Sequence, residues 1–213
     1  MARRAGSDGV QTEAAIRAAA LRLIAETGYE ALSMRRLAED IGIGAAALYR
    51  YFPNKQSILM SLLDRHMREL LAAWASARLP ENAAAPARLE AFTRFHIRHH
   101  LPRPDAVFLS YMELRSLTAD NFARIEALRR AYERDLVEIL AAGRREGSLL
   151  VAEPKVTARA IIAMLTGITT WYRAAGPISA DRLEALYWDL VARACGLPAA
   201  KPTEEETRCS MRA

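Results

Sequence analysis

Residues 33–55 constrain the fold of this chain more than any other stretch, because they contain two short amphipathic helices joined by a tight turn. Ser33 is suited to cap the first helix, since its hydroxyl can accept a hydrogen bond from a free backbone N–H of the first turn. Gly42 falls where the chain must reverse, which requires a positive φ that glycine adopts at little cost. Leu48 and Phe52 give the second helix a buried side. The pattern predicts a helix-turn-helix, whose second helix enters the DNA major groove.

This stretch and its flanks resemble the TetR family of bacterial transcriptional repressors. The resemblance rests on Thr27–Ser33 (TGYEALS), on residues 37–43 and above all on Leu48–Lys55 (LYRYFPNK), and it covers about residues 12–65. It implies an all-α fold with an N-terminal three-helix DNA-binding domain and a C-terminal helical bundle for ligand binding and dimerisation. It also implies a ligand-responsive repressor that binds a palindromic double-stranded DNA operator as a homodimer and is released by a small-molecule effector.

Hydrophobic periodicity predicts about nine helices and no strand. Besides the two helices above, the expected helices span about 10–27, 55–78, 86–100, 105–117, 119–146, 154–174 and 179–195. The expected domains are a disordered arm (1–9), the DNA-binding domain (10–54), the ligand-binding and dimerisation domain (55–197) and a disordered tail (198–213).

Composition excludes several classes of protein. The formal net charge of +5 is consistent with nucleic-acid binding, although many unrelated proteins share it. The 2 cysteines suggest neither a disulfide framework nor a zinc site, and no run of apolar residues is long enough for a membrane span. We therefore expect a soluble cytoplasmic protein. No Gly-x-Ser-x-Gly, phosphate-loop or His-Glu-x-x-His motif occurs, which predicts no catalytic residue, no metal, no cofactor and no enzymatic activity.

The candidate DNA contacts lie on the second helix of the motif and beside it. They are Ser33, Arg35, Gly44, Ala45, Ala46, Tyr49, Arg50, Tyr51 and Lys55. The resemblance implies phosphate contacts by Tyr49 and Lys55, and Arg35 matches a family position that often reaches the groove. The alternative for the tyrosines is simple packing on the first helix. Residues 44–47 depart from the family pattern because they offer only methyl groups, which suit contact with thymine methyls.

Aromatic, methionine and basic residues of the C-terminal helices are candidates for an effector site. They are Phe92, His96, Phe108, Met112, Arg115, Met164 and Trp171. Residues 171–173 and 114–117 look like the C-terminal domain of a TetR branch whose members sense acyl-CoA thioesters. An apolar tunnel would hold the acyl chain, with basic residues between 94 and 103 at its mouth for the CoA phosphates. The alternatives are a plain core and a drug-like effector, as in a regulator of efflux.

His96, His99 and His100 share one helix face at spacings of three and four residues. Such spacing can hold a metal, but no cysteine or carboxylate nearby completes a site. Solvated or core histidines, or a contact with an anionic ligand, are the other interpretations.

The last two predicted helices are candidates for the dimer interface. The residues selected on them are Leu165, Gly167, Ile168, Leu186 and Leu190. We expect these helices to pair with their copies as a four-helix interface. Two other functional classes stay open: an all-helical enzyme or ligand-binding protein without DNA binding, and a helical protein of the membrane surface.

Overall fold

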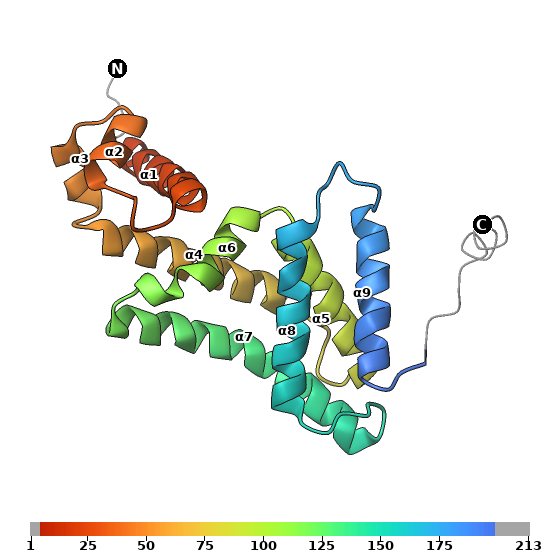
Figure 1. The fold of residues 1–213 in the computed structure, drawn as a ribbon. Helices are drawn as coiled ribbons and strands as arrows, with labels where there is room; N and C mark the ends of the chain where they lie inside the picture. The colour runs from red at the N-terminus through yellow and green to blue at the C-terminus, as the bar shows by residue number, and fades with distance from the viewer. Residues whose placement is uncertain (1–4, 199–213) are drawn as a thin grey trace. The chain divides into compact units, whose positions relative to one another are not determined.

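A computed structural model describes residues 5–198, which form nine α-helices, one 3-10 turn and no strand (Figure 1). The elements are α1 (Ala5–Thr27), α2 (Met34–Asp40), α3 (Ala45–Tyr51), α4 (Lys55–Ala77), α5 (Ala85–His100), α6 (Pro104–Met112), the 3-10 turn η1 (Leu114–Ser116), α7 (Ala119–Glu146), α8 (Pro154–Trp171) and α9 (Ala180–Ala194). The all-α class predicted from the sequence is confirmed. The expected tail lies outside the described residues from position 199 onward.

Three helices differ from the sequence prediction by three residues or more, and one of them is α8, which ends at Trp171 rather than at residue 174. Helix α1 begins at Ala5 rather than at residue 10. The single helix expected over 105–117 is divided, because Glu113 leaves the helical conformation with φ −100° and ψ 7°. The Glu113 carboxylate accepts hydrogen bonds from the backbone N–H of Tyr29 and the hydroxyl of Ser116. These contacts offer the chain an alternative to the next α-helical turn.

The chain folds into two compact units. Among the described residues, the first comprises 5–76 together with His99–Tyr132, and the second comprises Ala77–Arg98 together with 133–198. Helices α5 and α7 therefore contribute residues to both units.

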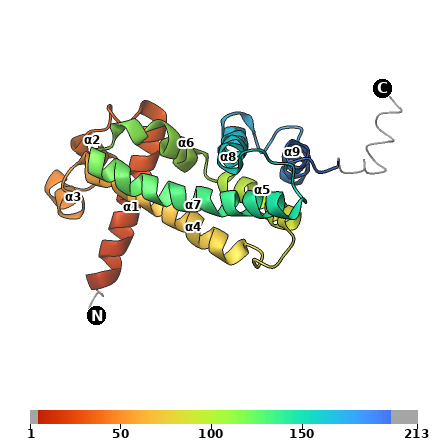
Figure 2. The same ribbon diagram turned by 90° about the horizontal axis from the view of Figure 1, so that it is seen from below.

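In the first unit, α1 packs against α2 and α6 (Figures 1 and 2). The apolar stripe of α1 is buried as its spacing predicts, with Ile16, Ala20, Leu23 and Ile24 at most 3% exposed. Arg22 on α1 binds both carboxylate oxygens of Asp40 on α2 at 2.7 and 2.6 Å. Burial and this bidentate pair together orient the helix-turn-helix on α1.

In the second unit, α8 and α9 run side by side next to α5 (Figures 1 and 2). His96 Nε2 on α5 lies 3.1 Å from the hydroxyl oxygen of Thr166 on α8. Arg98 on α5 donates to Glu184 on α9, with a distance of 2.8 Å from Nε to Oε1. Both contacts accompany an apolar core that contains Leu89, Phe92, Ile161, Leu165, Ile168, Leu183 and Val191.

Three buried histidines lie together in the first unit. His66 on α4 is 6% exposed, and His99 and His100 at the end of α5 are 8% and 4% exposed. The ring centroids are 5.9 Å apart for His66 and His100, and 5.5 Å apart for His99 and His100. Burial lowers the pKa of His66 to about 4, with the charge of His99 as the next contribution, and burial also lowers the pKa of His99 to about 4.

Stability should therefore depend on pH below neutrality. A histidine whose pKa is lower in the folded state binds fewer protons there than in the unfolded chain, so stability rises with pH between the two values. The contribution is fully present above the unfolded value of 6.5 and is lost as the pH falls toward about 4. Urea unfolding from pH 7.5 to pH 5 should show this loss, and His66→Gln should reduce its slope. An unchanged slope in His66→Gln would show that His66 does not titrate in this range.

Candidate functional site

The geometry of the predicted helix-turn-helix follows from its cap and its turn. The Ser33 hydroxyl accepts a hydrogen bond from the backbone N–H of Arg36 at 3.2 Å, as expected of an N-cap. Gly42 has a φ of +71°, and its N–H donates to the Glu39 carbonyl, while the Ile43 N–H donates to the Ala38 carbonyl. These bonds satisfy carbonyls at the end of α2 and reverse the chain toward α3.

Helix α3 has a buried side and an exposed side. Leu48 is 0% exposed and Phe52, its C-cap, is 5% exposed, so the two anchor α3 in the core. Tyr49 is 51% exposed, Arg50 is exposed and Tyr51 is half-buried. Gly44, Ala45 and Ala46 at its start are exposed as well. The outer surface of α3 therefore presents phenol, guanidinium and methyl groups, which are suited to contact phosphates and thymine methyls.

Arg35 projects from α2 with an 88% exposed side chain, which forms an ion pair with Glu39 at 2.9 Å one turn later. The pair is exposed and contributes little to stability. A contact of Arg35 with a base or a phosphate therefore requires only that the DNA replace Glu39 as the partner of the guanidinium group.

Lys55 begins α4 beside two residues that sequence reasoning did not select. Its Nζ lies 3.2 Å from Glu30 Oε2 and 4.5 Å from the centroid of the Tyr29 ring. Tyr29 is 2% exposed, and burial raises the pKa of its phenol. The ring and the carboxylate hold the ammonium group in one place without burying it fully. Tyr29 and Glu30 belong to the TGYEALS segment, but their position beneath Lys55 depends on the folded loop.

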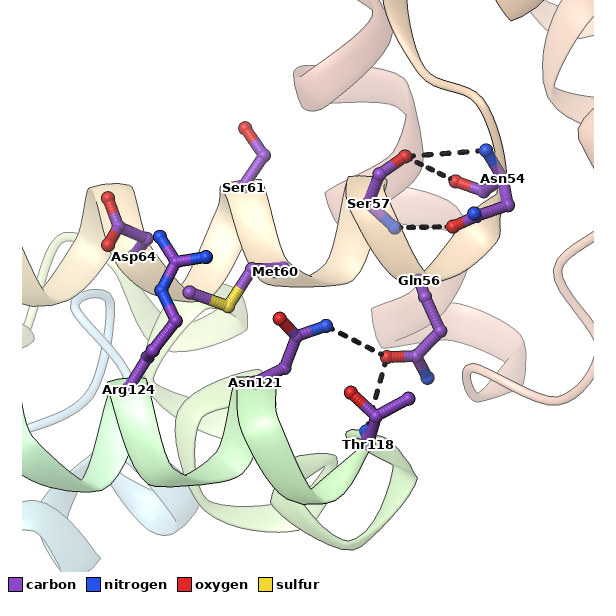
Figure 3. A pocket seen from close by; sticks show the side chains of 9 residues that line it. All are labelled: Asn54, Gln56, Ser57, Met60, Ser61, Asp64, Thr118, Asn121 and Arg124. Carbon is purple, nitrogen blue, oxygen red and sulfur yellow. Dashed lines mark hydrogen bonds between the residues drawn. The ribbon is translucent and has the colours of Figure 1, made fainter.

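A polar cleft of about 590 Å³ lies in the first unit between the start of α4 and the start of α7 (Figure 3). Its lining consists of Asn54, Gln56, Ser57, Met60, Ser61, Asp64, Thr118, Asn121 and Arg124. Asn54 Oδ1 accepts a hydrogen bond from the Ser57 N–H at 2.9 Å and so caps α4. Hydroxyls and amides dominate this lining, which makes it unlike the apolar cavity expected for an acyl chain.

The predicted effector-binding residues divide between the two units. In the second unit, Phe92 is fully buried and its ring centroid lies 6.1 Å from that of His96, while Met164 is half-buried. Trp171 is 48% exposed and stacks on Tyr187 of α9 at 6.5 Å. Phe108, Met112 and Arg115 belong to the first unit and are exposed. A common effector site for these residues stays a prediction.

The basic surface expected between residues 94 and 103 does not include the three histidines, because all three are buried in the core. His96 is 1% exposed and lies within hydrogen-bond distance of Thr166. The charges of Arg94 and Arg98 face the buried carboxylate of Glu184, at 3.9 and 2.7 Å. This carboxylate lies far along the sequence, so the helix pattern alone did not reveal it. Among the described residues, no group of three or more His, Cys, Asp or Glu side chains is placed so that it could hold a metal ion.

The residues selected for a dimer interface lie on α8 and α9 with different exposures. Leu165 and Ile168 are each 1% exposed, so they belong to the core of their own chain. Leu186 and Leu190 on α9 are 37% and 46% exposed, and Gly167 is half-buried. The last three offer surface that a second copy can contact.

Two family models match the chain over the regions just described. Residues 16–62 match the model for bacterial regulatory proteins of the tetR family, and residues 82–195 match the model for the tetracyclin repressor-like C-terminal domain. Within 5–198, no helix is long and apolar enough to cross a membrane.

Individual relatives match over most of their length. The fatty acid metabolism regulator protein of Bacillus subtilis (strain 168) is 26% identical over 155 residues, which cover 72% of this chain and 79% of the relative. A tetR-family regulatory protein from Rhodococcus RHA1 has a TM-score of 0.82 at 28% identity, covering 89% of this chain and 98% of that structure. AibR, solved in complex with isovaleryl coenzyme A and operator DNA, has a TM-score of 0.76 at 25% identity, covering 85% and 96%.

Proposed function

Because this chain belongs to the TetR family of transcriptional repressors, which bind DNA and are not enzymes, we propose that it binds a palindromic operator as a homodimer and is released by an acyl-CoA thioester. The proposal of operator binding rests on one observation: α3 has a buried side that anchors it and an exposed outer side. Two-fold symmetry of the protein would match two half-sites in successive major grooves.

The exposed residues divide into two roles. Tyr49 and Lys55 position the protein by donating to phosphates, which carry affinity without sequence information. Arg35 reads a base edge, for which the guanidinium fork is suited to guanine O6 and N7. Ser33 is occupied by its cap, so its contribution is to fix the start of α2. Arg50 and Tyr51 flank the phosphate-contacting surface, and the methyl groups of Ala45 and Ala46 approach the groove floor.

Substitutions of these residues should separate affinity from specificity. Tyr49→Ala should weaken binding to operator and scrambled duplexes alike, and Lys55→Ala should also reduce the salt dependence by about one unit per lost phosphate contact. Arg35→Ala should cost about 1–3 kcal/mol on the operator and relax the preference at one position in each half-site. The operator is first selected from a random duplex pool, and binding is then measured across salt concentrations. Wild-type binding by all three variants would contradict the DNA interface.

Two relatives support a thioester as the effector. AibR was solved with isovaleryl coenzyme A, and the Bacillus subtilis relative is named for fatty acid metabolism. Both likenesses cover more than two thirds of this chain, so they extend beyond the DNA-binding region into the C-terminal helices. In this chain Met164 and Trp171 supply apolar surface in the second unit, where Phe92 belongs to the buried core, and Phe108 and Met112 supply it in the first.

A titration of the protein–DNA complex tests the effector. Isovaleryl-CoA and octanoyl-CoA should release the protein, whereas the free acids and free CoA should act more weakly because each fills only part of the site. Such a ligand must bind the released conformation more tightly than the DNA-bound one, or the equilibrium does not shift. Phe108→Ala should weaken the response while leaving DNA binding in place. Release by hydrophobic drugs and by none of the thioesters would instead favour a regulator of efflux.

A further inference from the structure

The loop between α1 and α2, which precedes the helix-turn-helix, is held by a buried carboxylate from a distant part of the chain. Glu113, which follows α6, is 7% exposed, and its Oε1 accepts a hydrogen bond from the backbone N–H of Tyr29 at 3.2 Å. Its Oε2 accepts a second hydrogen bond from the Ser116 hydroxyl at 2.8 Å. Glu113 therefore fixes the loop between α1 and α2 and the turn η1 at the same time.

The first turn of α4 is attached to the same segment by a second side chain. The Gln56 amide nitrogen donates to the Ser116 carbonyl. Its Oε1 accepts from the Thr118 N–H at 3.4 Å and from the Asn121 amide at 3.5 Å (Figure 3). One amide group thus bridges α4 to the end of η1 and to the start of α7.

Both attachments converge on Lys55. Gln56 is its neighbour in the sequence, and Tyr29, which Glu113 holds through the backbone, lies beneath the Lys55 ammonium group at 4.5 Å. The segment of residues 113–121 is therefore connected to Lys55 from two sides, through the α4 backbone and through the Tyr29 ring. A displacement of this segment would move the ammonium group and the aromatic ring on which it rests.

We propose that Gln56 and Glu113 are positioning residues for operator binding, which attach residues 113–121 to the DNA-binding helices and hold Lys55 where it meets a phosphate. This inference rests on the proposed function, in which Lys55 contacts DNA. Neither side chain touches the DNA in this proposal, and each acts through the position of Lys55. The two side chains act by fixing the position of the Lys55 charge. Removal of either one should therefore reduce the salt dependence of DNA binding, as removal of the Lys55 charge does.

The test compares Gln56→Ala and Glu113→Ala with Lys55→Ala on the selected operator across salt concentrations. Each of the first two variants should lower affinity by about 3- to 10-fold and by no more than Lys55→Ala does, because each weakens the same charged contact with a phosphate. Each should also reduce the salt dependence toward that of Lys55→Ala, which a merely structural role would not do. The double variant Gln56→Ala/Lys55→Ala should bind no worse than Lys55→Ala alone, since both changes remove one contact.

Two controls accompany these variants. Ser76→Ala removes an exposed hydroxyl of the same helix whose hydrogen bond goes to the Ala72 carbonyl one turn earlier, and it should leave affinity and salt dependence at wild-type values. Glu113→Gln keeps an acceptor for the Tyr29 N–H and should restore most of the binding lost in Glu113→Ala. Wild-type salt dependence in Gln56→Ala and Glu113→Ala, or additive losses in the double variant, would overturn the proposal.

Hydrogen exchange on the DNA-free protein separates this proposal from the proposed function. In Glu113→Ala the amides of residues 28–33 should exchange faster, and in Gln56→Ala those of residues 116–121 should do so, while those of α8 and α9 should keep wild-type rates in both variants. If the wild-type chain selected no duplex, the proposed function would fail. The exchange measurement would still show whether Gln56 and Glu113 attach residues 113–121 to the DNA-binding helices. Unchanged exchange over residues 28–33 in Glu113→Ala, or over residues 116–121 in Gln56→Ala, would overturn it in either case.

Discussion

Leu190→Asp should abolish operator binding at concentrations where the wild-type chain binds fully, because it places a charge on the exposed face of α9 that we propose pairs with a second copy. Leu190 is 46% exposed in the chain itself, so the substitution leaves the chain's own core intact. A monomer reaches only one half-site and loses the advantage of linked binding, which is on the order of 10²–10⁴ in affinity. Sedimentation and operator titration measure the two effects together.

Two further variants make this prediction specific. A Cβ added at Gly167 meets no atom within 4 Å, so Gly167→Ala should leave the stability of the chain unchanged, and any weakening of assembly by Gly167→Ala would come from contact with a partner. Leu79→Asp, at a leucine 38% exposed outside α8 and α9, is the matched control and should behave as wild type. A wild-type chain that sediments as a monomer at micromolar concentration would remove the proposed dimer.

Arg98→Ala should destabilise the second unit by about 2–4 kcal/mol, because it leaves a buried carboxylate without its main partner. Glu184 is 2% exposed, and Arg98 contacts both of its oxygens at 2.8 and 2.7 Å. Arg94, at 3.9 Å, is too distant to replace a charge-assisted hydrogen bond. Urea unfolding of the variant and of the wild type measures the loss in the free energy of unfolding.

The removal of both partners distinguishes this explanation from a loss of packing. Arg98→Ala/Glu184→Met should recover most of the stability, because no buried charge is left unpaired. Arg159→Ala breaks an exposed pair with Glu133 in the same unit and should cost less than about 1 kcal/mol. Equal losses in Arg98→Ala and Arg159→Ala would show that burial of Glu184 does not decide the effect.

Local patterns predicted the helix-turn-helix because each of its features depends on neighbours in the sequence. Ser33 caps the helix that follows it, Gly42 supplies the positive φ of the turn, and Leu48 lies one helical turn from Phe52. The exposed position of Tyr49 follows from the same periodicity, since Leu48 and Phe52 lie four residues apart on the buried side and Tyr49 is not at that spacing from either of them. The division of the predicted helix over 105–117 was missed, because the carboxylate that stabilises the break at Glu113 binds the distant Tyr29.

The sequence by itself determined the fold class, the helix-turn-helix and the residues exposed on α3, because capping, glycine conformation and hydrophobic spacing act over a few residues. Only the tertiary structure decided which polar groups meet. Glu184 neutralises Arg98 from another helix, Glu113 binds the backbone of Tyr29, and Gln56 bridges α4 to α7. These contacts join residues far apart in the chain, and their geometry arises only when the helices pack, since no local periodicity encodes the partner of a buried charge.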